Sequence, residues 1–226
     1  MELPTGLFDL VMHLDKYLGA FTSHYGVLTY AVLAGIIFCE TGLVVTPFLP
    51  GDSLLFAAGA TASTPGTALA PGLLLLILWL AGVCGDSTNY WIGRFIGPRA
   101  FHSNSRLLNK KHLERTRVFY ERHGGSTVIM ARFVPIVRTF APFVAGIGAM
   151  RYRRFIIFSM LGNLLWVGLF VLGGYFFGGL PLVKDHFSMV ILAVILISFV
   201  PGAVEFIKQR REFRSKPAPP AAVDAP

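Results

Sequence analysis

The 226-residue chain is poor in charge, since Asp, Glu, Lys and Arg together make up 14% of it. A soluble domain carries about 25%. Hydrophobic residues reach 54%, the mean hydropathy is +0.62, and the apolar residues form long blocks rather than alternating with polar ones. This composition excludes a soluble domain and predicts an all-α polytopic membrane protein.

Patterns typical of several other classes are also missing. The two cysteines, Cys39 and Cys84, lie in apolar stretches, so we interpret them as small buried residues rather than as a disulfide. The six histidines are scattered without ligand spacing, so we expect no metal and no other cofactor. The N-terminus lacks the basic region of a cleaved signal peptide. No nucleophile is flanked by a base, which disfavours an enzyme.

The net charge of +8 is concentrated beside apolar segments. Eight of the 20 Lys and Arg residues lie between Arg94 and Arg122, and five more lie between Lys208 and Lys216. Basic loops of this kind are cytoplasmic under the positive-inside rule, so we place the C-terminus in the cytoplasm. No folded basic domain with stacking aromatic residues is present, so we expect no nucleic-acid partner.

Three uninterrupted apolar segments are long enough to be transmembrane helices. They cover residues 73–97, 155–178 and 188–207. They belong to one membrane domain, expected over residues 27–207. Before it, residues 1–26 contain an amphipathic helix that either lies along the membrane surface or packs on the bundle. After it, residues 208–226 form a basic segment and a disordered Pro/Ala-rich tail.

Two further apolar segments, residues 27–62 and 126–150, are interrupted by proline and glycine. The second is bounded by basic clusters on both sides and is too short for two spans, so we predict that it is re-entrant. We predict the same for the first, which could otherwise be a span followed by a half-helix. The expected helix breaks are at Pro47, Pro50, Gly51, Pro135, Pro142 and Gly146.

These broken segments carry two acids and two bases. Glu40 and Asp52 bound the run ETGLVVTPFLPGD, and Arg132 and Arg138 lie in RFVPIVRTFAPFVAG. A charged side chain at mid-bilayer costs about 2.5–3.5 kcal/mol on insertion scales, so such residues face a partner or water. We therefore predict that the four side chains meet in an aqueous cavity between the two segments.

A weak internal repeat supports this arrangement. Each half has a broken segment followed by a span. The first span contains Gly85-Asp86 and ends in G-R-F-I-G, and the second contains Gly162-Asn163 and ends in G-Y-F-F-G. The charge rule gives the two spans opposite directions, so we predict an inverted repeat whose re-entrant hairpins face each other. Such an interface is where transporters bind their substrates. We interpret Asp86 and Asn163 as residues that hydrogen-bond between helices.

Three motifs resemble the DedA family of bacterial inner-membrane proteins, which is related to the eukaryotic VTT lipid scramblases. They are Glu40 with the P-F-L-P-G-D run, the F-x-P-x-x-R-x-x-x-P-x-x-A-G run of residues 133–146, and Gly162-Asn163 with Trp166. The resemblance covers residues 20–205. It implies a fold with two facing re-entrant hairpins in the inner membrane. It also implies lipid movement, notably of undecaprenyl phosphate or phospholipid, that depends on the proton motive force.

The resemblance further implies that an acidic pair and an arginine pair are essential, and these match Glu40, Asp52, Arg132 and Arg138. The residues themselves leave alternatives open. The arginines could clamp a phosphate as bidentate donors, or merely neutralise the two acids. Asp52 could serve the site or cap a helix N-terminus. Burial favours the neutral form of Glu40, which suits a proton carrier. We interpret Trp166 as a packing residue.

The leading functional hypothesis is a lipid translocase whose anionic substrate binds Arg132 and Arg138, with protons carried by Glu40 or Asp52. Its partners would be membrane lipids and protons, and the sequence leaves a homo-oligomer open. The alternative is a proton-coupled exporter of small cations or drugs, in which the two acids form the ion site. A non-transporting scaffold is a further alternative.

Overall fold

The structure is a computed structural model of the chain. It describes residues 14–43, 51–100, 128–129, 131–132, 135–148, 150–181, 183, 186–194 and 196. Within these residues the regular elements are helices and no strand is present, which confirms the all-α class. The helices are α2 (Leu14–Tyr25), α3 (Leu28–Gly42), α4 (Gly51–Ala62), α5 (Pro71–Ala100), α7 (Pro135–Ile147) and α8 (Tyr152–Phe177).

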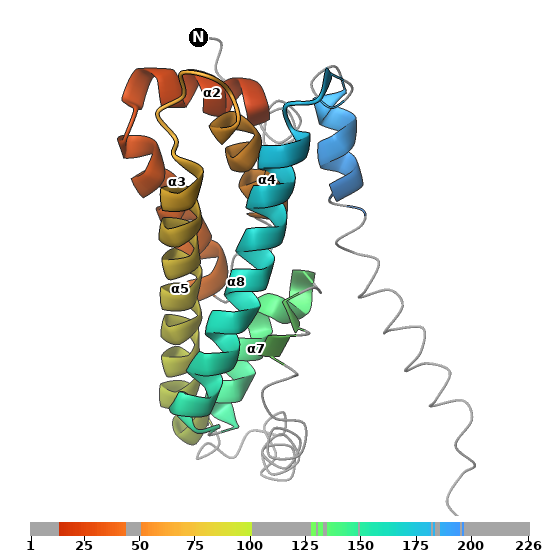
Figure 1. The fold of residues 1–226 in the computed structure, drawn as a ribbon. Coiled ribbons are helices and arrows are strands. Elements are labelled where there is room, and N and C mark those ends of the chain that lie inside the picture. Colours follow the sequence, from red (N-terminus) through yellow and green to blue (C-terminus); the bar gives the residue numbers. More distant parts are fainter. Residues whose placement is uncertain are drawn as a thin grey trace, which may run out of the picture.

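Helices α5 and α8 form the long axis of the bundle (Figure 1). Each has an apolar stretch of 26 residues, and a helix of that length, about 39 Å, exceeds the hydrocarbon core of a bilayer, about 30 Å. The two helices are antiparallel, because Tyr90 of α5 stacks on Phe155 while the earlier Trp79 donates to the carbonyl oxygen of Met160. The predicted spans 73–97 and 155–178 are thus present as long helices.

The remaining predicted span is covered only in part. Residues 188–194 and 196 are described and helical, and the rest of the segment 188–207 lies outside the described residues. The same holds for residues 1–13 and for the basic tail 208–226. Within the described residues, α5 and α8 are the helices long and apolar enough to cross a membrane.

Helices α3 and α4 run antiparallel. Near the start of α3, the hydroxyl of Tyr30 accepts a hydrogen bond from the backbone N–H of Ala70, in the loop after α4. At the other end, Glu40 lies against Gly51, the first residue of α4. The interruption predicted within residues 27–62 is therefore present as a reversal of direction. Its re-entrance into a membrane stays a prediction.

The predicted helix breaks have different outcomes. Pro47 and Pro50 lie outside the described residues. Pro135 begins α7, a position where its missing N–H has no helical partner to lose. Pro142 and Gly146 both lie within α7, so the prediction that they interrupt the helix was wrong. An internal proline deletes one backbone hydrogen bond, and close packing on α5 holds this helix together across it.

Glycines bring the short helices into backbone contact with the long ones. A Cβ atom at Gly59 of α4 would lie 2.9 Å from the carbonyl carbon of Val171 in α8. One at Gly146 of α7 would lie 3.0 Å from the carbonyl carbon of Tyr90 in α5 and 2.8 Å from the backbone nitrogen of Arg94. Real Cβ atoms essentially never come closer than 3.0 Å to such atoms. Each position therefore requires a residue without a side chain.

The long helices contribute matching glycines. A Cβ atom at Gly174 of α8 would lie 2.8 Å from the carbonyl carbon of Phe56, and one at Gly93 of α5 would lie 2.9 Å from that of Phe143. In each pair of helices, the second glycine contact lies three residues along each helix from the first. The two pairs therefore support a repeat in which G-R-F-I-G is aligned with G-Y-F-F-G. In that alignment Gly85-Asp86 and Gly162-Asn163 do not coincide, because they are offset by four residues.

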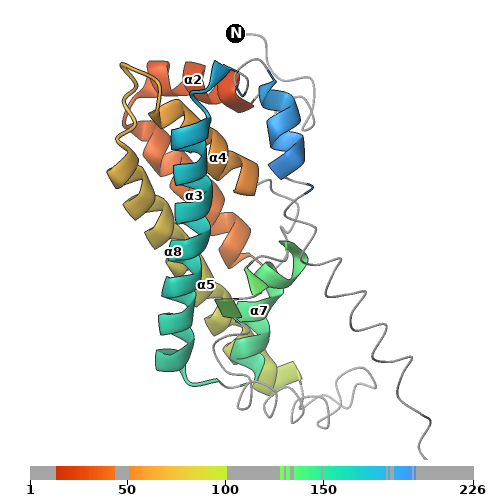
Figure 2. The ribbon, with the colours of Figure 1, turned by 45° about the vertical axis from the view of Figure 1, so that its right-hand side comes forward.

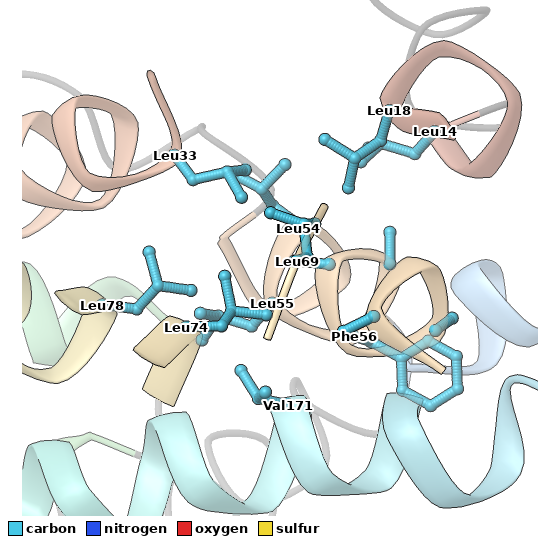
Figure 3. Packing of buried hydrophobic residues seen from close by; sticks show 14 of the residues in the cluster. Leu14, Leu18, Leu33, Leu54, Leu55, Phe56, Leu69, Leu74, Leu78 and Val171 are labelled. Carbon is cyan, nitrogen blue, oxygen red and sulfur yellow. The ribbon is translucent and has the colours of Figure 1, made fainter. Parts of the chain in front are cut away.

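The larger hydrophobic core lies where α2, α3, α4, α5 and α8 meet (Figure 3). Each helix contributes buried side chains, among them Leu18, Leu33, Leu55, Leu74 and Val171. The described part of the amphipathic N-terminal segment thus packs on the bundle, which was one of the two arrangements predicted for it. Figure 2 shows α2 across one end of the bundle and α7 toward the other.

Candidate functional site

Arg138 joins three helices at the centre of the candidate site. From α7 its Nη1 donates to Oδ1 of Asp52 at the start of α4, and its Nη2 donates to Oε1 of Glu40 near the end of α3. All three residues are buried, with exposed fractions of 6%, 8% and 1% respectively. The structure therefore brings together three of the four predicted charges, and both acids contact the same guanidinium.

Asp52 does not occupy the N-cap position, because α4 already begins at Gly51. Its Oδ1 accepts from the indole Nε1–H of Trp166 at 2.8 Å as well as from Arg138. These two side-chain contacts place Asp52 beside Arg138 and Trp166, and its role in a functional site stays a prediction. Gly51 also has a defined role, since any Cβ atom there would overlap the carboxylate of Glu40.

Trp166 of α8 lies between the two arginines. The guanidinium carbon of Arg138 is 5.0 Å from the centroid of the indole ring, and that of Arg132 is 5.6 Å from it. These distances fit cation–π contacts, which strengthen when the groups are removed from water. Trp166 is 1% exposed and hydrogen-bonded within the site, so interpreting it as a packing residue alone was incomplete.

Arg132 belongs to a second charged centre. Its Nη2 forms an ion pair with Oδ2 of Asp86 in α5, and both side chains are buried. The same oxygen accepts from the hydroxyl of Ser159 at 2.5 Å and from the amide Nδ2 of Asn163 at 3.0 Å, both in α8. The prediction that Asp86 and Asn163 hydrogen-bond between helices is therefore confirmed, and the two residues are partners of each other. The ion pair with Arg132 was not anticipated.

Several polar atoms of these two centres are buried without a hydrogen-bond partner among the described residues. They are Oε2 of Glu40, Oδ1 of Asp86, Nη1 of Arg132, Nε of Arg138 and Oδ1 of Asn163. A buried donor or acceptor without a partner costs about 1–3 kcal/mol, and more for a charged group. Buried polar groups without a partner require an explanation, such as a functional role or a bound water or ion.

The formal charge of the whole site is uneven. Glu40, Asp52 and Asp86 supply three carboxylates, whereas Arg132 and Arg138 supply two guanidiniums. If all five groups are ionised, the sum is −1. The four predicted residues alone would sum to zero, so Asp86 changes the charge balance of the site.

The residues for which sequence reasoning predicted no place in the charged site follow helical spacing. On α8, Ser159, Asn163 and Trp166 lie at i, i+4 and i+7, so they share one face. On α5, Asp86 and Asn89 lie three residues apart, and the amide of Asn89 donates to the Thr41 carbonyl of α3 at 3.0 Å and the Thr139 carbonyl of α7 at 2.7 Å. A polar stripe on an otherwise apolar span was the available signal.

A cavity of about 650 Å³ lies at the α2 end of the bundle, between α2, the end of α4 and the loop after it. Its lining contains none of the five charged residues. The aqueous cavity predicted around Glu40, Asp52, Arg132 and Arg138 stays a prediction, and in this structure those side chains are enclosed.

Comparison with known proteins gives a consistent result. The VTT domain family matches residues 49–176. The chain is 50% identical to Protein DedA of Escherichia coli (strain K12) over 212 residues, which cover 93% of this chain and 97% of that protein. It is 41% identical to an uncharacterised membrane protein of Mycobacterium tuberculosis (strain H37Rv), covering 85% and 86% of the two chains.

A further relative is the inner membrane protein YghB of Escherichia coli (strain K12), at 33% identity over 77% of this chain and 79% of that one. No solved structure matches the chain. The family match spans more than half of the sequence, and relatives across its length are named as membrane proteins. The chain is therefore a membrane protein, and it belongs to the DedA family of VTT-domain proteins.

Proposed function

We propose that this protein is a lipid translocase of the bacterial inner membrane that moves an anionic lipid, such as undecaprenyl phosphate or a phospholipid, in response to the proton motive force. The observation that carries the proposal is the cluster of three carboxylates and two guanidiniums enclosed among apolar helices. The protein moves its substrate without changing it chemically, so it is not an enzyme.

The charge balance suggests how protons are coupled to the lipid. With all five groups ionised the site carries −1, which repels a phosphate. One proton on a carboxylate brings the site to zero, so the net repulsion of an anion ends and a guanidinium can attract it. Arginine suits this role because it stays protonated and donates to phosphate oxygens in a fixed fork.

Opening the site requires the ion pairs to separate. Breaking a buried pair by removing one partner costs about 3–5 kcal/mol, because the other charge remains uncompensated. A proton delivered to Glu40 or Asp52 lowers this cost by neutralising one acid that holds Arg138. The enclosed arrangement of this structure fits a resting state that protonation releases.

The net charge of −1 also favours the second candidate function, a proton-coupled exporter of small cations or drugs. In that case the carboxylates bind the cation and the arginines are counter-ions. The two functions differ in their response to Arg138→Ala. Removing this arginine abolishes transport of an anionic lipid, whereas it preserves or increases cation binding.

The experiment is flux in proteoliposomes with the purified protein, using labelled undecaprenyl phosphate, labelled phospholipid and a cationic dye, each with and without a pH gradient. We expect lipid flux that rises with the gradient and is lost in Arg138→Ala and Glu40→Gln. Arg153→Ala is the matched control, since this arginine is exposed at the start of α8. Lipid flux unaffected by Arg138→Ala would refute the proposal, and dye flux alone would establish the exporter.

A further inference from the structure

The two arginines of the site have different surroundings. Arg138 is held by two carboxylates, Glu40 and Asp52, so its charge is more than balanced. Arg132 is held by one, Asp86, and its Nη1 is buried with no hydrogen-bond partner among the described residues. An approaching anion therefore meets a net negative environment at Arg138 and a neutral pair with an available donor at Arg132.

Asp86 is itself fixed independently of Arg132. The hydroxyl of Ser159 and the amide of Asn163 both donate to its Oδ2, the oxygen that pairs with Arg132. These two donors lie on α8 and remain when the ion pair separates. Asp86 can therefore release the guanidinium without being left unpartnered, as a displaced counter-ion must.

The stem of Arg132 packs closely on α8. A Cβ atom at Gly162 would lie 3.3 Å from Cγ of Arg132, tighter than nine in ten real Cβ contacts, so this glycine lets the stem lie against the helix. The guanidinium carbon lies over the Trp166 ring, 5.6 Å from its centroid. This cation–π contact stays in place if another anion replaces the carboxylate of Asp86.

We propose that Asp86 is the resting counter-ion of Arg132, and that the phosphate of an anionic lipid displaces it and binds Arg132 rather than Arg138. This inference rests on the proposed function and gives the two arginines different roles. Arg132 contacts the substrate. Arg138 holds α3, α4 and α7 together until a proton weakens its hold on the two acids.

The test measures lipid binding with Trp166 as the reporter. The chain has three tryptophans, so Trp79→Phe and Trp91→Phe leave Trp166 as the single tryptophan, which is excited selectively over tyrosine. This protein, in phosphatidylcholine nanodiscs, is titrated with phosphatidic acid and separately with undecaprenyl phosphate. The two arms separate a general phosphate preference from a polyprenyl one.

Asp86→Asn removes the competitor for Arg132, so we expect both lipids to bind about tenfold more tightly, equivalent to 1.4 kcal/mol. The matched change Asp52→Asn leaves Glu40 on Arg138, so its effect should be clearly smaller. Arg132→Gln should abolish binding. Ser87→Ala, one residue after Asp86 on α5, serves as the control outside the site.

The outcomes distinguish the two proposals. If the starting protein binds neither lipid, both the proposed function and this inference are wrong. If it binds but Asp52→Asn tightens binding as much as Asp86→Asn or more, the function stands and this inference is overturned. Loss of binding in Asp86→Asn would likewise overturn it, because Asp86 would then support the anion rather than compete with it.

A second measurement, the melting temperature, tests the proposal even if Asp86→Asn is less stable than the starting protein. Asp86→Asn leaves the buried Arg132 without a counter-ion, so its melting temperature in phosphatidylcholine should fall. Phosphatidic acid should restore that temperature, and it should stabilise Asp86→Asn more than the starting protein. Equal stabilisation of the two proteins would contradict displacement.

Discussion

The contact between α4 and α8 offers the sharpest test of the fold. A Cβ atom at Gly174 would lie 2.8 Å from the carbonyl carbon of Phe56 and 2.9 Å from the backbone nitrogen of Ala60, against the 3.0 Å that real Cβ atoms respect. Both obstacles are backbone atoms, so no side chain can rotate away. Gly174→Ala must push the two helices apart.

The magnitude follows from the packing. Inserting a methyl group into a tightly packed contact costs about 1–3 kcal/mol. Gly168 lies on the same helix with nothing within 4 Å of its Cβ position, so Gly168→Ala meets no obstacle. Replacing glycine by alanine within a helix then stabilises it by about 0.5–1 kcal/mol. The two variants should therefore move stability in opposite directions.

The assay is equilibrium unfolding in mixed micelles, followed by far-UV circular dichroism during titration with SDS. We expect Gly174→Ala to unfold at lower SDS than the unmodified protein and Gly168→Ala at the same or higher SDS. Since α4 carries Asp52, Gly174→Ala should also reduce lipid flux. Equal unfolding midpoints for the two variants would refute the helix contact.

Three further changes test other parts of the bundle. Trp166→Phe deletes the donor to Asp52, which should cost about 1.5–3 kcal/mol because the acceptor is charged, and should lower flux; the loss is measured by unfolding and transport together. Tyr30→Phe deletes the hydroxyl that joins the start of α3 to the loop after α4, and an unfolding titration should show a loss of about 0.5–1.5 kcal/mol. Asn89→Ala deletes the amide that joins α3 and α7. It should destabilise the protein more than Tyr30→Phe does, because two backbone acceptors lose a buried donor. A larger loss of stability in Tyr30→Phe than in Asn89→Ala would contradict this arrangement.

The two broken segments show which helix breaks the sequence can predict. The run around Pro47 and Pro50 predicts a reversal between α3 and α4, and the structure contains one. The same reasoning failed at Pro142, which lies inside a continuous helix. A proline deletes one hydrogen bond in either case, and whether the helix ends depends on the packing on both sides. That packing is not visible in the local sequence.

The site shows the same division. A charged residue within an apolar segment is rare because burying it is costly, so the sequence alone identifies Glu40, Asp52, Arg132 and Arg138 as candidates. Asp86 is equally charged, but a single acid on a long span is compatible with a helix–helix hydrogen bond. Only its position beside Arg132 shows that it belongs to the charged site and brings the formal sum to −1.

The sequence by itself determined the membrane class, the two long helices and the identity of four charged residues, because hydropathy and the cost of burying charge are properties of segments. The tertiary structure decided which acid pairs with which arginine, since partners in α3, α4, α5 and α7 are separated by up to 98 positions along the chain. It also decided that glycines bring the helices together, because the need for a missing side chain exists only where another backbone is close.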